Sequence, residues 1–479
     1  MKQALVIILI GRIFQVLLSI LILKISTVYL STEEMGIYFL FVSILSYFGL
    51  TLIGPVGHFV IRKVNEWKNE KTLKTNLFKY NIYVIAISLA SVPVLIGIEK
   101  IFGNFGGISL RTQLVLIPIG IYVTTLNTTF TPILNLLDRR IAFVVFTNMT
   151  LIFNLMFSVF LVSKLGKYGI NWFIGQLLAQ LLLLLISGVY LYRKINDERT
   201  SIKKIDINKK SFEKVYNFSV PLVFSSLFIW VSNESFRFII EKNINVSYVG
   251  IIGVGFAIAT KIATSVETLV HQIYYPIYYK NICSEKIEDR EKAWNTLLQQ
   301  ALPLYIGVTF YIICMSPFFL RVLTSKEYFG AMYFVVAGAM FNFFRMLNNL
   351  MSLITHAEYR TKLLLIPNSI AALCTVLLVM FVSKHEHYYY AVPISLALCS
   401  LIGALLLFVF VNKIISIKIE FNKIFLMISL NGLYLLGWCF FEYANSLIYS
   451  LVAISLGGTY FLISQGLIYK IYNFKRELK

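Results

Sequence analysis

Long apolar runs separated by short polar connections divide the chain along its whole length. The runs are continuously apolar, as in LLLLLISGVYLY from Leu182 and SLALCSLIGALLLFVFV from Ser395. A membrane-spanning helix needs about 20 such residues, whereas the strands of a membrane barrel alternate apolar and polar residues. The pattern therefore predicts about fourteen transmembrane helices, at residues 4–23, 36–58, 80–98, 113–133, 142–163, 172–192, 216–240, 248–270, 296–320, 329–353, 363–383, 391–411, 424–441 and 447–469.

The composition fits a chain whose main solvent is lipid. Hydrophobic residues make up 58% of the 479 positions and charged residues only 14%, whereas a soluble domain would carry about 25% charge. The predicted spans leave no stretch for a sizeable soluble domain. We therefore expect an all-α integral membrane protein.

The formal net charge of +20 follows the predicted topology. The connections on the side of the N-terminus hold 30 Lys and Arg residues, and those on the opposite side hold 9. Basic residues collect in cytoplasmic loops of membrane proteins, so this alternation predicts an even number of helices with both termini cytoplasmic. The positive charge needs no nucleic-acid partner, and we expect none.

The longest basic connection falls near the middle of the chain and predicts a linker between two halves. We expect an N-terminal six-helix bundle over residues 1–192, a cytoplasmic linker over 193–215, a second six-helix bundle over 216–411, and an extra helix pair with a basic cytoplasmic tail over 412–479. Superposing Gly36 on Gly250 aligns GIYFLFVSIL with GIIGVGFAIA. Such repeats are common in transporters, with the substrate path between them, so the halves predict two pseudo-repeated bundles around a central cavity.

Charged residues inside the predicted spans are the candidate functional groups, because charge is costly in a bilayer. Lys261 lies about 20 Å from the outer end of its span, and snorkelling explains it least well. Glu234 and Arg237 stand three residues apart and could simply pair, while the others could either snorkel or line a path. The surplus of positive charge suits an anionic solute, phosphates above all. The proposed substrate-binding cations are Arg12, Arg237, Lys261 and Arg345, and the acids that could pair with them or couple transport to protons or sodium are Glu234, Glu267 and Asp138.

Motifs for catalysis are missing from the sequence, which has no Walker loop, GxSxG, HExxH or CxxC. Two histidines and a glutamate in KHEHYYY are too few ligands to predict a metal site. We therefore expect a transporter with no catalytic residue, no metal and no cofactor other than a coupling ion.

Four segments resemble polysaccharide flippases of the multidrug/oligosaccharidyl-lipid/polysaccharide (MOP) superfamily. They are GRIFQVLLSILILKI, STEEMGIYFLFVSILSYFGL, FSVPLVFSSLFIWVSNESFRFII and FLRVLTSKEYFGAMYFVVAGAMF. The resemblance implies alternating access and transfer of an undecaprenyl-pyrophosphate-linked oligosaccharide from the cytoplasmic to the periplasmic leaflet of the bacterial inner membrane, for O-antigen of lipopolysaccharide or for capsule. It also implies membrane lipids, a polysaccharide polymerase and a chain-length regulator as partners.

The resemblance carries over to two residues. Arg12 matches the family's early-helix Arg, and Arg237 matches the Arg of its seventh helix. Phe236 stands where an acid is common, with Glu234 as a replacement. The family often has twelve helices, which leaves the role of the last predicted pair open.

Three alternatives remain beside this interpretation. A lipid II flippase of the same superfamily would also have a cationic cavity and fourteen helices. A cation-coupled drug exporter would present buried acids, which are outnumbered here. A membrane polysaccharide polymerase should carry a large outside loop, whereas the longest in this sequence has about 13 residues.

Overall fold

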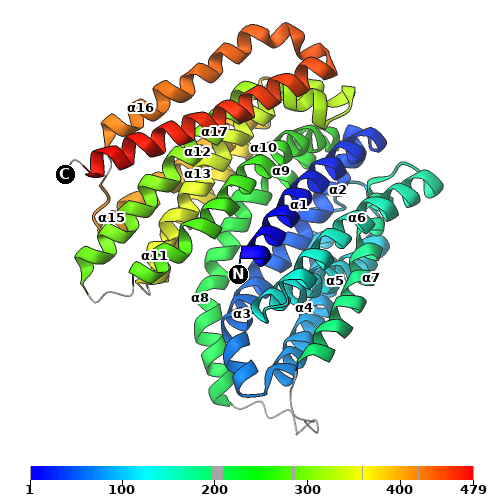
Figure 1. The fold of residues 1–479 in the computed structure, drawn as a ribbon. Helices are drawn as coiled ribbons and strands as arrows, with labels where there is room; N and C mark the ends of the chain where they lie inside the picture. The colour runs from blue at the N-terminus through cyan, green and yellow to red at the C-terminus, as the bar shows by residue number, and fades with distance from the viewer. Residues whose placement is uncertain (1, 196–208, 283–285, 359, 419, 478–479) are drawn as a thin grey trace. The chain divides into compact units, whose positions relative to one another are not determined.

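A computed structural model describes residues 2–195, 209–282, 286–358, 360–418 and 420–477. Within these ranges every regular element is helical, and there is no strand (Figure 1). The elements in chain order are α1 (Lys2–Tyr29), α2 (Thr32–Tyr47), the π-helical η1 (Phe48–Ile53), α3 (Gly54–Asn69), α4 (Leu73–Phe102), α5 (Leu110–Leu136), α6 (Arg140–Leu165), α7 (Gly169–Lys194), α8 (Lys209–Glu234), α9 (Phe236–Asn243), α10 (Val246–Ile273), α11 (Tyr275–Asn281), α12 (Ile287–Leu323), the 3₁₀-helical η2 (Lys326–Ala331), α13 (Met332–Ala357), η3 (Thr361–Leu364), α14 (Leu365–Val382), α15 (Tyr388–Asn412), α16 (Phe421–Gly432), η4 (Leu433–Asn445) and α17 (Leu447–Glu477).

The described residues include 12 helices that are long and apolar enough to cross a membrane. They coincide with twelve of the fourteen predicted spans, so the prediction of a multi-pass, all-α membrane protein is confirmed. The other two predicted spans are also helical but interrupted. Residues 216–240 fall on α8 and α9, which meet at Ser235, and residues 424–441 fall on α16 and the 3₁₀ turn of η4. The count of fourteen and the placement of the termini stay predictions.

The chain forms two compact units, residues 1–250 and 251–479. The first unit contains α1 to α9 and the first turn of α10, and the second contains the rest. The unit boundary therefore falls inside α10, whereas the sequence pattern placed the division in the basic linker. Residues 196–208 of that linker lie outside the described residues. The proposed repeat boundaries stay a prediction. A compact unit is defined by contacts within it, whereas a repeat is defined by a likeness between two parts of the chain.

The start of α2 is specified by its sequence. The Ser31 hydroxyl caps the helix by accepting a hydrogen bond from the Glu34 backbone N–H at 3.3 Å. Two acids in the first turn suit the positive end of the helix dipole. The Glu34 carboxylate also accepts from the Gly169 N–H at 2.6 Å, which joins the N-termini of α2 and α7.

Glycines let α2 approach the first turn of α10 inside the first unit. A Cβ on Gly36 would lie 2.1 Å from the Val246 carbonyl oxygen, and a Cβ on Gly250 would lie 1.9 Å from that of Thr32. The contact is reciprocal, since each glycine meets the residue four positions before the other. The superposition of Gly36 on Gly250 as equivalent positions of a repeat stays a prediction.

The second unit is built around α12, its longest helix. Helices α13 and α17 pack against α12, and α15 packs against α13 and α14; in Figure 1, α17 runs alongside α12. The connection into α16 is fastened to α12 by Asn295, whose amide donates to the Ser416 carbonyl at 2.9 Å and accepts from the Lys418 N–H at 2.8 Å. The extra helix pair is thus an integral part of this unit.

Candidate functional site

Glu234 and Arg237 form an ion pair at the junction of α8 and α9. Both groups contact Ser43 on α2, because an Arg237 nitrogen donates to the Ser43 hydroxyl at 2.6 Å and a Glu234 oxygen lies 2.8 Å from it. The side chains are only 12% and 21% exposed for Arg237 and Glu234. A buried charge needs a partner, and here each charge supplies one for the other. The pairing suggested by their spacing is confirmed.

Aromatic rings surround the same ion pair. The Arg237 guanidinium lies over the rings of Phe39 and Phe236, 5.5 and 5.4 Å from their centroids. The indole N–H of Trp230 donates to the backbone oxygen of Ser43 at 3.0 Å. Phe236 therefore contributes a ring beside the guanidinium, while Glu234 supplies the negative charge from three residues before Arg237.

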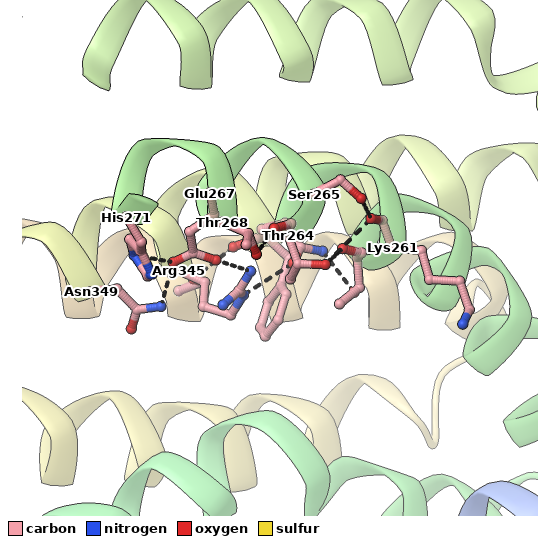
Figure 2. Close-up of polar contacts among 12 residues, drawn as sticks. Lys261, Thr264, Ser265, Glu267, Thr268, His271, Arg345 and Asn349 are labelled. Atoms are coloured by element: carbon pink, nitrogen blue, oxygen red, sulfur yellow. Dashed lines mark hydrogen bonds and ion pairs between the residues drawn. The ribbon is translucent and has the colours of Figure 1, made fainter. Parts of the chain in front are cut away.

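A second ion pair joins α10 to α13 in the second unit (Figure 2). Arg345 donates to Glu267 at 3.0 Å, and the Asn349 amide donates to the other Glu267 oxygen at 2.8 Å. Arg345 also donates to Asn342, whose amide reaches Thr260 at 3.0 Å. The Glu267 side chain is only 5% exposed. Both of its oxygens are engaged, so Glu267 holds the two helices together and orients Arg345.

Lys261 lies on α10 apart from this network. Among the residues that the structure describes, none accepts a hydrogen bond from its ammonium group or pairs with it, and Figure 2 shows no contact drawn to its side-chain nitrogen. The side chain is half-buried, and α10 belongs to a stretch apolar enough to span the membrane. Lys261 is therefore an uncompensated cation at membrane depth.

Arg12 on α1 is the second of the four predicted cations that has no carboxylate partner among the described residues. One of its terminal nitrogens donates to Gln15 at 2.8 Å, and the guanidinium lies over the Phe143 ring of α6, 5.3 Å from its centroid. Its Nε is buried without a hydrogen-bond partner. Neither contact neutralises the charge, so Arg12 remains available to an anion.

Asp138 lies outside the helices, in the short connection between α5 and α6. Its carboxylate is 79% exposed and 3.7 Å from Arg140, and its backbone adopts the left-handed conformation with φ of 61°. Aspartate tolerates this conformation better than most residues, which explains its place at the end of α5. The position gives Asp138 no share in an intramembrane site.

The structure thus separates the four predicted cations into two kinds. Arg237 and Arg345 are each neutralised by a glutamate of the same unit, whereas Arg12 and Lys261 are not. Sequence reasoning missed Ser43, Asn342 and Asn349, which complete the two ion-pair networks. A signal for the last two was present, since Asn342, Arg345 and Asn349 follow helical spacing inside a span.

Comparison with known proteins places the chain in a family. The family model described as "Polysaccharide biosynthesis protein" matches residues 27–333, more than half of the chain. No match was found among curated proteins.

Three solved structures share the fold. A lipid II flippase, MurJ, in an inward closed conformation has a TM-score of 0.69 at 18% identity, over 98% of this chain and 100% of that one. An inward-facing multidrug resistance MATE family transporter of the MOP superfamily has a TM-score of 0.61 at 12% identity, over 83% and 93%. A MOP superfamily transporter from Pyrococcus furiosus, whose binding pocket is described as having reverse polarity, has a TM-score of 0.56 at 12% identity, over 86% and 96%.

These likenesses extend over 98%, 83% and 86% of the chain, and the family match covers both the Glu234–Arg237 junction and α10. The expected family is therefore confirmed: the chain belongs to the polysaccharide biosynthesis protein family and has the fold of the MOP superfamily.

Proposed function

We propose that this protein is a flippase for an undecaprenyl-pyrophosphate-linked oligosaccharide. It would move the repeat unit of a surface polysaccharide such as O-antigen from the cytoplasmic to the periplasmic leaflet of the bacterial inner membrane, by alternating access and with both termini in the cytoplasm. The family match to polysaccharide biosynthesis proteins and the MOP fold support the class of activity.

The single observation that supports the proposed substrate class is the uncompensated charge of Lys261. Placing a lone ammonium group at membrane depth costs free energy, and an anionic ligand would offset that cost through charge-assisted hydrogen bonds. A pyrophosphate group joined to a lipid is such a ligand, and it reaches membrane depth with its lipid. Arg12 is the second proposed contact, because its guanidinium also lacks a carboxylate.

Arg237 and Arg345 have a different role in this proposal. Their charges are already balanced by Glu234 and Glu267, so we assign them to holding α2 against the α8–α9 junction and α10 against α13. The same pairing argues against an exporter of cationic drugs, which would need carboxylates free to bind cations. It also leaves Glu234 and Glu267 poorly suited to carry a coupling proton or sodium ion, and Asp138 is too exposed.

A lipid II flippase is the second candidate. The structural likeness to MurJ covers 98% of this chain, including α16 and α17, whereas the likeness to the MATE transporter covers 83%. Lipid II carries the same pyrophosphate, so Lys261 and Arg12 would serve it equally. The family match to polysaccharide biosynthesis favours the oligosaccharide. A polysaccharide polymerase and a chain-length regulator are the expected partners in that pathway.

The experiment compares Lys261→Ala, Lys261→Arg and wild type in cells whose own copy is deleted. We expect Lys261→Ala to lower surface polysaccharide at least about tenfold, since one charge-assisted contact contributes about 1.5 to 3 kcal/mol, and to leave the lipid-linked saccharide in the inner leaflet. Lys261→Arg should restore export in part. Lys164→Ala, at an exposed lysine in the last turn of α6, is the matched control.

The chemical identity of the accumulated lipid decides between the two candidates. Accumulation of a lipid-linked polysaccharide repeat unit supports the proposal, and accumulation of lipid II supports the second candidate. Normal export by Lys261→Ala, at normal protein level, would overturn the role given to Lys261.

A further inference from the structure

Helices that face lipid in the second unit expose apolar side chains. On α14 the exposed positions are Leu373, Leu377 and Phe381, at 59%, 57% and 64%. This is the expected pattern, because hydrocarbon offers no partner to polar groups. An open helix face that is polar within a span must therefore meet water or a ligand.

Helix α10 has such an open polar face, which we call the α10 polar face. Its members follow Lys261 at intervals of three, four, seven and eleven residues, which places them on one side of the helix. All are partly or fully accessible, and they are Lys261, Thr264, Ser265, Thr268 and Gln272. Another side of α10 carries Ala259, Ala263, Glu267 and Val270, all buried, and a third exposes Leu269 and Ile273 as expected for lipid.

The hydroxyl groups of this face keep their acceptor capacity. Thr264, Ser265 and Thr268 each donate to the carbonyl oxygen four residues earlier, at 2.7 Å. Their donors are thus satisfied within the helix, and their oxygen lone pairs remain for donors of a ligand. Figure 2 shows Thr264 and Thr268 between Lys261 and the Glu267 network.

The face therefore offers a cation at one end and hydrogen-bonding oxygens beyond it. It is about 16 Å long, because it spans eleven residues that each rise about 1.5 Å along the helix. Its complement is a ligand with an anionic group joined to a chain of hydroxyl donors. A phosphate-linked saccharide has this chemistry, whereas a lipid headgroup with a single phosphate offers few donors beyond the charge.

We propose that the α10 polar face binds the saccharide of the transported lipid, with Lys261 on its phosphate and Thr264, Thr268 and Gln272 contacting sugar hydroxyls. The inference rests on the proposed function and adds the residues that distinguish one saccharide from another. Glu267 is not among these contacts, because its oxygens are already engaged by Arg345 and Asn349.

The test measures binding of two probes to purified protein in detergent. One probe is undecaprenyl pyrophosphate without sugar, and the other is the lipid-linked saccharide extracted from cells that lack the protein. The variant Thr264→Val/Thr268→Val replaces two hydroxyls by methyl groups at nearly constant volume. We expect it to weaken saccharide binding about tenfold, as the loss of two hydrogen bonds implies, and to leave sugarless binding unchanged. Lys261→Ala should weaken both.

Two controls keep the result specific. Thr459→Val removes a hydroxyl that donates in the same way to Ser455, at an exposed position of α17, and should change neither affinity. Thr268→Ser in the Thr264→Val background keeps one hydroxyl and should recover part of the saccharide affinity. Gel filtration of each variant checks that it is folded.

The outcomes separate this inference from the proposed function. If wild type binds neither probe, the proposed function fails. If wild type binds both and the double valine variant weakens both equally, or neither, the proposed function stands and the role of the α10 polar face is refuted.

Discussion

Removal of the Glu267 carboxylate should destabilise the second unit more than any loss of hydrogen bonds alone. Glu267→Ala would leave the Arg345 guanidinium, 22% exposed, without its negative partner between α10 and α13. Breaking one side of a buried ion pair costs about 3 to 5 kcal/mol. Arg345 keeps partial access to solvent and its bond to Asn342, so we expect the lower end of that range, about 3 kcal/mol.

The size of this effect distinguishes charge from hydrogen bonding. Hydrogen bonds between membrane helices contribute about 0.6 kcal/mol each on average, so the loss of two neutral bonds would amount to about 1 kcal/mol. Glu267→Gln keeps an oxygen for Arg345 but removes the charge. We therefore expect Glu267→Gln to be destabilised as well, though less than Glu267→Ala.

A double-mutant cycle measures the pair directly. Glu267→Ala, Arg345→Ala and the double variant are purified in detergent, and the free energy of unfolding of each is obtained by titration with a denaturing detergent. Because the double variant leaves no unpaired charge, it should lose about 2 kcal/mol less than the sum of the single variants. Additive losses, or a loss below about 1 kcal/mol for Glu267→Ala, would refute the assignment of this pair to helix–helix attachment.

Two further predictions concern close contacts within each unit. Gly250→Val should lower the yield of folded protein and reduce its free energy of unfolding by about 1 to 3 kcal/mol, because the added Cβ would lie 1.9 Å from the Thr32 carbonyl oxygen; titration with a denaturing detergent measures the loss. Gly466→Ala, which has no atom within 4 Å of the added Cβ, should leave the free energy of unfolding unchanged in the same titration. Asn295→Ala should speed hydrogen exchange at the Lys418 amide severalfold, since it removes the acceptor 2.8 Å away, and unchanged exchange there would show that Asn295 does not fasten this connection.

The helices of the fold could be predicted from the sequence because lipid imposes one simple rule on every span. Twelve of the fourteen predicted spans match helices that are long and apolar enough. The rule says nothing about interruptions, which depend on local geometry. The π-helical segment of η1 lies inside an apolar run, and no change of hydropathy marks it. The break at Ser235 falls in the polar stretch SNES, which does not by itself say where a helix ends.

The candidate site was predictable only as a set of unusual charges. Spacing along one helix indicated the Glu234–Arg237 pair, because residues three apart share a face. The Glu267–Arg345 pair joins residues 78 positions apart, and no helical period connects them. For the same reason Ser43, 191 residues from Glu234, could not be foreseen as the hydroxyl between the two charges.

The two kinds of cation differ in what they indicate about the substrate. A paired arginine is stable in the empty protein, so its presence says little about what is transported. An uncompensated lysine within a span is costly unless water or an anion meets it, so a bound anion would stabilise the protein more at Lys261 than at a paired arginine. Lys261 therefore points to an anionic ligand more strongly than Arg237 and Arg345 together. The α10 polar face continues from Lys261 through Thr264, Thr268 and Gln272, so the ligand that we propose carries hydroxyl groups beside its negative charge.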